Sequence, residues 1–194
     1  MDHALILKNI SKHITLTKAD QAYFISLLGS KKIKAKQFLL KAGEICKESS
    51  FVTSGCLRGY TVDKEGVEHI LSFAPQDWWI GDMYSMLSQK PGNLNIEAME
   101  DTEVTILSKK DQDELYEKVP KFERFFRIIT EKSLVAYQQR LMDNLSLTAQ
   151  ERYLKFCTTY PAIINTIPQK QVAAYIGVTP EFLSKLKAKY LKSH

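Results

Sequence analysis

The spacing of hydrophobic residues divides the chain into three stretches. Apolar side chains recur every three or four positions in residues 5–29, a period that predicts helices. From residue 31 to about 107 they alternate with polar residues in short segments, separated by turn formers such as Lys41-Ala-Gly43 and Pro91-Gly-Asn93. Many short strands in succession predict an antiparallel sandwich or barrel. From residue 110 the helical period returns, so we expect an α+β protein.

A long helix is predicted over residues 121–145, beginning after Pro120. At ~1.5 Å per residue its length exceeds what a small barrel covers. One stripe of this helix advances in steps of four and three residues, as in a coiled coil. We expect this stripe to form the interface of a homodimer. Its residues are Phe122, Phe126, Ile129, Ser133 and Ala136. The alternative is a helix that packs wholly on its own barrel.

Positive charge is concentrated at the end of the chain. Residues 1–145 hold 20 Lys or Arg and 20 Asp or Glu, whereas residues 146–194 hold seven and two. The whole net charge of +5 therefore lies in the last quarter of the chain. This distribution indicates a polyanionic partner for that part, and the alternative is a solvated, lysine-rich helix face.

Composition and motifs argue against several classes of protein. No apolar run approaches the ~20 residues of a membrane helix, and the N-terminus does not have the pattern of a signal peptide. Three cysteines, an odd number, favour a reduced, cytoplasmic protein over a disulfide framework. There is no nucleophile elbow, phosphate-binding loop or paired-cysteine site, and the four histidines are scattered. We therefore expect neither an enzyme nor a resident metal or cofactor.

Residues 168–187 have the pattern of a helix-turn-helix. Val172 supplies the buried aliphatic residue of the first helix, and Ala173 the small residue where the two helices cross. Gly177 fits a turn that requires positive φ. Thr179 is positioned to cap the second helix, which would begin at Pro180. The alternative is a helical hairpin used for protein contacts.

The outward residues of this motif are candidates for contacts with DNA. Side chains near the start of the second helix reach base edges in the major groove, and polar side chains around the turn hold phosphates. The expected DNA-binding residues are Gln169, Gln171, Thr179, Glu181, Ser184, Lys185 and Lys189.

The order of these parts resembles the Crp/Fnr superfamily of bacterial transcription regulators, over nearly the whole chain. Leu40-Lys-Ala-Gly43-Glu44 is similar to the early β-roll of that family, and Gly81-Asp-Met-Tyr-Ser-Met-Leu87 resembles its phosphate-binding cassette. The segment from Leu115 to Phe122 resembles the entry to its dimerisation helix, and Gln169–Leu186 resembles its DNA-reading unit. The resemblance implies a cyclic nucleotide-binding-like β-roll, a double-stranded β-helix, followed by a helix-turn-helix that lacks an evident wing.

The resemblance also implies an effector site in the cassette. Its expected residues are Gly81, Asp82, Met83, Gly92 and Asn93. Asp82 stands where the family has a carboxylate that meets the ribose hydroxyl. In cyclic-AMP-binding members an Arg-Ser pair precedes the alanine that corresponds to Ala98, and here Gly92-Asn93 takes its place. Without that arginine the cyclic phosphate would not be neutralised, so we expect poor binding of cyclic AMP and a different small effector.

The predicted organisation has three parts. Residues 1–120 form an effector-binding β-roll with flanking helices, residues 121–145 the dimerisation helix, and residues 146–194 the DNA-binding domain. The predicted function is a regulator that binds double-stranded DNA at an inverted-repeat operator. The alternative is a sensor or interaction module that keeps the fold without binding DNA.

Overall fold

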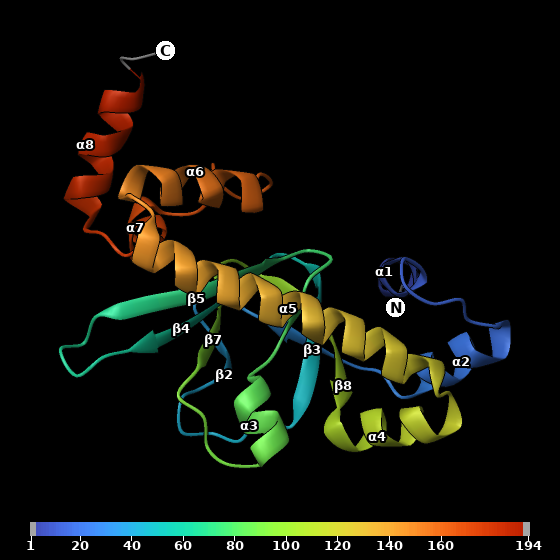
Figure 1. Ribbon diagram of the computed structural model, residues 1–194. Coiled ribbons are helices and arrows are strands. Elements are labelled where there is room, and N and C mark those ends of the chain that lie inside the picture. Colours follow the sequence, from blue (N-terminus) through green and yellow to red (C-terminus); the bar gives the residue numbers. More distant parts are fainter. Residues whose placement is uncertain (1–2, 192–194) are drawn as a thin grey trace.

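The computed structural model describes residues 3–191, with side chains described as far as residue 188. The fold is α+β, as predicted, with two antiparallel sheets and mostly helical segments on either side of them along the chain (Figure 1). Its elements are α1 (Ala4–Ser11), α2 (Lys18–Ser26), β1 (Gly29–Ile33), β2 (Phe38–Leu40), β3 (Glu48–Ser54), β4 (Cys56–Val62), β5 (Glu68–Pro75), β6 (Trp79–Ile80), α3 (Met83–Ser88), β7 (Asn95–Ala98), β8 (Thr102–Ser108), α4 (Lys109–Lys118), α5 (Lys121–Ser146), α6 (Ala149–Thr159), α7 (Gln169–Ile176) and α8 (Pro180–Leu191).

Two four-stranded sheets form the β-roll, with strand orders β1-β8-β3-β6 and β2-β7-β4-β5. Every strand pairing is antiparallel. Alternate residues of the strands point into the roll, where Val52, Leu57, Ile96 and Val104 are buried in one cluster. The first and last strands of the roll pair along β1 and β8, so the roll holds its own two ends together.

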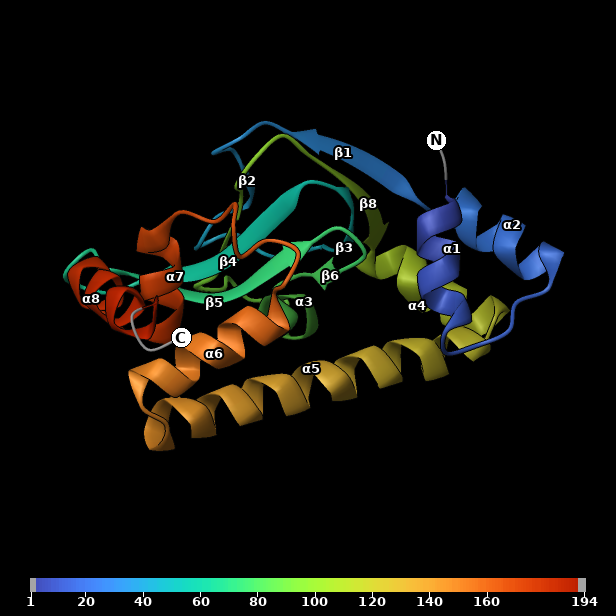
Figure 2. The ribbon, with the colours of Figure 1, turned by 90° about the horizontal axis from the view of Figure 1, so that it is seen from above.

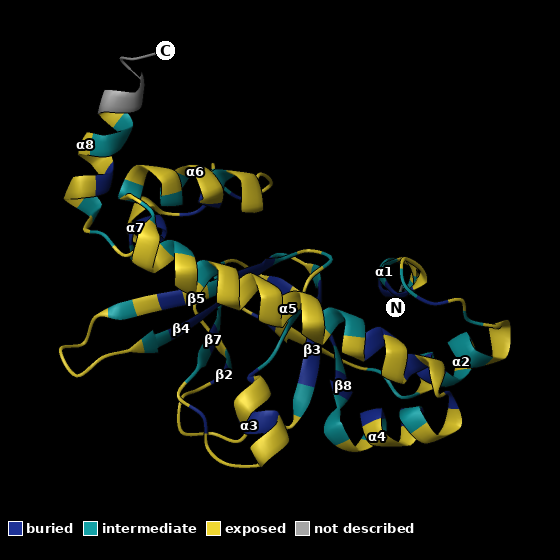
Figure 3. Cartoon of the chain, in the orientation of Figure 1, coloured by how far each residue is buried: buried dark blue, intermediate teal, exposed yellow. Residues whose placement is uncertain are grey.

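Helices α1, α2 and α4 surround the first turns of α5. A second cluster buries Ile6, Ile10 and Phe24 of the N-terminal helices against Phe122 and Phe125 of α5. The rings of Phe24 and Phe122 stack with their centroids 4.7 Å apart. Beyond these turns α5 runs along the β-roll with most of its residues exposed (Figures 2 and 3).

The helix-turn-helix shares a third cluster with the β-roll. Phe73 of β5 contacts Phe156 of α6 and Tyr160, the residue after α6, edge to face, and Val172 and Ile176 of α7 are buried in the same cluster. The chain reverses between α5 and α6, which brings α7 against β5 (Figure 2). The segment predicted as a separate DNA-binding domain is therefore docked on the outside of the sheet.

Two of the residues expected at a dimer interface are not at the surface. Phe122 is fully buried and Phe126 is 7% exposed, both inside the cluster made with the N-terminal helices. The prediction that they lie at a dimer interface was therefore wrong. The periodicity of α5 shows which residues share a buried face, but it does not show what covers that face. Among the described residues, no helix combines the length and apolar character needed to cross a membrane.

Candidate functional site

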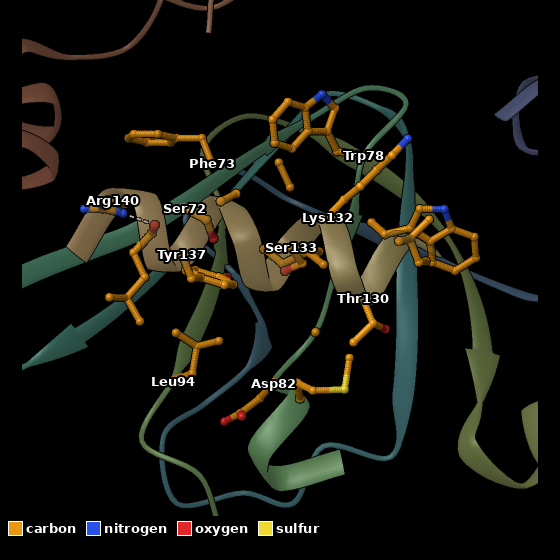
Figure 4. Close-up of a pocket in the computed structure, with 18 of the residues that line it drawn as sticks. Ser72, Phe73, Trp78, Asp82, Leu94, Thr130, Lys132, Ser133, Tyr137 and Arg140 are labelled. Carbon is orange, nitrogen blue, oxygen red and sulfur yellow. Dashed lines mark hydrogen bonds between the residues drawn. The ribbon is translucent and has the colours of Figure 1, made fainter. Parts of the chain in front are cut away.

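A cavity of about 1410 Å³ lies between the β-roll, the inner face of α5 and helices α3 and α6 (Figure 4). Four of the five expected effector residues line it: Gly81, Asp82, Met83 and Asn93. Ser133 and Ala136 of the expected dimer stripe also line it, and the partly buried Ile129 lies between the cavity and the N-terminal cluster. The inner face of α5 thus covers a cavity.

Gly92, the fifth expected effector residue, is buried behind Asp82 and does not line the cavity. A Cβ at this position would overlap Asp82 Oδ2 and would lie 3.2 Å from Ser85 Cβ. Its amide donates to the Glu44 carbonyl, and its carbonyl accepts from Gly43. Only glycine fits the space, so this position has no side chain with which to bind an effector.

Asp82 is the ionisable residue in the floor of the cavity, only 6% exposed. It caps α3, because its Oδ1 accepts the Ser85 amide proton at 3.1 Å. Ser85 Oγ in turn donates to the Lys90 carbonyl and accepts from the Cys46 amide at 2.9 Å. These hydrogen bonds connect Asp82, Ser85 and Lys90 and join this segment to Cys46.

Several lining residues were not in the expected site. Ser72 and Phe73 come from β5, Trp78 precedes β6, Leu94 precedes β7 and Tyr137 lies on α5. In Figure 4, Tyr137 and Leu94 lie between Asp82 and Phe73. One feature of the sequence pointed to these residues. The stripe along the long helix includes polar residues, which suit a helix that covers a cavity better than a helix at a dry interface.

Arg140 joins the cavity to the helix-turn-helix. Its guanidinium donates to the carbonyls of Ile70 and Leu71 in β5 and, at 2.8 Å, to the carbonyl of Tyr175 in α7. The guanidinium carbon lies 3.7 Å from the centroid of the Tyr175 ring, a cation–π contact. Arg140 and Tyr175 both line the cavity. One side chain thus contacts the β-roll, the cavity and α7.

The helix-turn-helix has the geometry that its sequence predicts. Val172 and Ala173 are buried, and Gly177 ends α7 with φ of +72°. Thr179 Oγ1 accepts the Phe182 amide proton at 3.2 Å, and Leu183 returns α8 to the core. The turn and the cap hold α8 so that one side of the helix is exposed to solvent.

The expected DNA-contacting residues lie mostly on that free side. Glu181, Ser184 and Lys185 of α8 are exposed, as are Gln169 and Thr179. Gln171 is half-buried, and its side-chain oxygen is enclosed without a hydrogen bond among the described residues. The side chain of Lys189 lies outside the described residues. Hydrogen bonds from its own backbone amide and from the Thr179 hydroxyl lower the pKa of Glu181, at the start of α8.

Comparison with known proteins gives matches to one fold. Residues 30–119 match the family model of the cyclic nucleotide-binding domain. The anaerobic regulatory protein of Haemophilus influenzae is 22% identical over 173 residues, which cover 84% of this chain and 66% of that protein. The protein of the same name from Aggregatibacter actinomycetemcomitans is 24% identical with the same coverage. The chain thus spans just under two thirds of the length of these curated relatives.

Solved structures share this architecture. The structure of FixK2 from Bradyrhizobium japonicum superposes with a TM-score of 0.75 at 18% identity, covering 86% of this chain and 85% of that one. The c-di-GMP responsive global regulator CLP of Xanthomonas campestris superposes with a TM-score of 0.74 at 11% identity, covering 91% and 93%. The likeness spans the β-roll, the long helix and helices beyond it.

Proposed function

We propose that the chain belongs to the Crp/Fnr superfamily and is a transcription regulator that binds double-stranded DNA and responds to a small effector. The observation that carries the proposal is α8, whose exposed Glu181, Ser184 and Lys185 stand on a capped helix after a tight turn. The matching relatives are regulatory proteins rather than enzymes.

The proposed DNA-binding surface combines base-reading and phosphate-binding residues. Lys185 donates to guanine and Glu181 accepts from cytosine when α8 lies in the major groove. Gln169 and Thr179, at the N-terminal ends of α7 and α8, are placed to bind phosphates together with free backbone amides. The net charge of +5, all of it contributed by residues 146–194, favours this end of the molecule for a polyanion.

The proposed dimer uses the outer face of α5. The apolar residues Leu134, Val135, Leu141 and Leu145 are between 62% and 81% exposed, and none of them lines the cavity. A second copy of the chain would cover them in a two-fold arrangement. Of the residues expected at this interface, Ile129, Ser133 and Ala136 lie toward the cavity, so they would contribute at most its edge.

The proposed effector site is the cavity that lies between α5 and the β-roll. Cyclic AMP should bind it poorly, because Gly92 is enclosed and Asn93 carries no charge to neutralise the phosphate. The unpaired carboxylate of Asp82 would also repel it. Titration calorimetry with cyclic AMP tests this, and a micromolar or tighter site would contradict it.

DNA binding is tested by fluorescence anisotropy with genomic fragments at two salt concentrations. We expect binding that weakens with salt and is reduced by Lys185→Ala. Lys110→Ala is the matched control, because Lys110 is exposed on α4, outside the helix-turn-helix. No binding by the unmodified protein, with and without cell extract to supply an effector, would favour the alternative of a sensor or interaction module.

A further inference from the structure

The carboxylate in the floor of the cavity can accept more hydrogen bonds than it does. Asp82 is 6% exposed, and its Oδ1 is occupied by the Ser85 amide. Among the described residues, Oδ2 makes no hydrogen bond and no ion pair, and it lies against the Cα of Gly92. Asp82 Oδ2 is not fully enclosed, so it is free to accept a hydrogen bond from a molecule in the cavity.

Nearly all the cations around the cavity are already engaged. Lys109 pairs with Asp113, Arg127 pairs with Glu131 and Lys155 pairs with Asp143. Arg140 and Arg152 donate to backbone carbonyls. Lys132 has no ion pair among the described residues, and it lies in the upper part of the view, away from Asp82 (Figure 4). None of these cations donates to Asp82 Oδ2, and a bound molecule can supply that donor.

The walls near Asp82 are apolar and aromatic. In Figure 4, Leu94 and Tyr137 lie between Asp82 and Phe73, and Trp78 lies at the opposite end of the view. Aromatic faces attract cations and pack well against flat rings. Ser72 and Ser133 add neutral hydroxyl groups. This lining suits a ring-containing molecule, and the Asp82 carboxylate determines the charge of the group that would lie against it.

We propose that the cavity binds a small, ring-containing molecule that carries an ammonium group and no phosphate, with the ammonium group donating to Asp82 Oδ2. The proposal rests on the proposed function in one respect, namely that this cavity is the effector site. The ammonium group completes the hydrogen bonding of the carboxylate and neutralises it, and the ring lies against Tyr137 and Leu94.

Three indole compounds with different charges test the proposal by titration calorimetry on the full chain. Tryptamine is the cation, tryptophol the neutral alcohol and indole-3-acetate the anion. We expect tryptamine to bind at least about tenfold more tightly than indole-3-acetate, with tryptophol between them. Equal affinities, the reverse order, or no binding of any of the three at millimolar concentration would overturn the proposal.

The variant Asp82→Asn separates charge from folding. Asparagine caps a helix as well as aspartate does, so α3 keeps its first turn. We expect this variant to lose the preference for tryptamine over tryptophol. Glu117→Gln is the matched control, since it removes one negative charge from an exposed position on α4. A preference that survives Asp82→Asn would overturn the role of the carboxylate.

A separate measurement distinguishes this proposal from the proposed function. DNA binding is measured on the same preparation without any indole compound. DNA binding without the expected order of affinities rejects only the ligand class. The expected order without DNA binding, with or without cell extract, rejects the regulatory function and leaves the ligand class in place.

Discussion

At the scale of single residues, Gly92 gives the cassette its shape. Gly92→Ala would place a Cβ into Asp82 Oδ2, so either the Asp82 side chain, which the Ser85 amide holds, or the loop itself has to shift. We expect a loss of about 1–3 kcal/mol in the free energy of unfolding, measured by urea denaturation, as for other overpacked sites. Gly81→Ala is the control, because the nearest atom to its Cβ would be a carbonyl oxygen at 3.7 Å. Equal stability of the two variants would contradict the packing argument.

The start of α6 gives a prediction about pH. Thr148 and Glu151 form a capping box, and the hydrogen bonds from the Thr148 side chain and amide lower the pKa of Glu151. A carboxylate with a lowered pKa stabilises the fold above its unfolded pKa, and this contribution is lost as the pH falls through the folded pKa.

The variant Thr148→Ala tests that cap. It removes the hydroxyl donor and acceptor, so the pKa of Glu151 should rise toward its ordinary value, as followed by NMR titration. Loss of the cap should also cost about 1 kcal/mol of stability at neutral pH. An unchanged pKa would show that the box does not hold Glu151 in solution.

At the scale of elements, the sequence predicted the existence of α5 better than its surroundings. The predicted range 121–145 differs from the observed Lys121–Ser146 by one residue. The stripe that begins with Phe122 does face inward, but toward α1, α2 and the cavity. Periodicity identifies which residues share a face, whereas long-range packing decides what covers that face. The cassette was likewise located from its local sequence, but Phe73, Trp78 and Tyr137 reach the site only through the folded topology.

The contact between α5 and α7 depends on Arg140, which no local pattern identifies. Arg140→Met would leave the carbonyls of Ile70, Leu71 and Tyr175 without this donor. We expect a loss of about 1.5–3 kcal/mol in the free energy of unfolding and faster amide hydrogen exchange in α7. Arg140→Lys keeps the charge but not the planar guanidinium group. Its free energy of unfolding should therefore lie between those of the unmodified protein and Arg140→Met. Unchanged exchange in α7 would show that the aromatic cluster around Phe73 alone holds it on the sheet.

At the scale of the whole molecule, the exposed apolar residues of α5 predict assembly. Leu141 is 62% exposed in one chain, and Leu141→Glu would place a charge in the middle of the proposed interface. We expect the unmodified protein to be a dimer and Leu141→Glu to be a monomer at micromolar concentration, measured by light scattering, with unchanged circular dichroism. Lys110→Glu on α4 should remain a dimer. An unmodified protein that is already monomeric would contradict the interface.

The proposed dimer would also determine how DNA is read. Two copies of α8 related by a two-fold axis should enter successive major grooves about 34 Å apart, so the operator should be an inverted repeat. Because α7 is docked on β5, the separation of two α8 helices in such a dimer would depend on that contact as well as on α5.

Lys185 and Thr179 should then affect binding in different ways. Lys185→Ala should cost about 1–3 kcal/mol on the preferred half-site and relax the preference at one base pair, because Lys185 is exposed on the free side of α8. Thr179→Ser keeps the hydroxyl that caps α8 and should preserve binding, whereas Thr179→Ala should weaken all sequences alike, since the cap orients the whole helix. Anisotropy titrations of each variant against a panel of half-site sequences measure both effects. Equal losses on every sequence for Lys185→Ala would assign that lysine to the DNA backbone, and the reading of bases would then rest on Glu181 and Ser184.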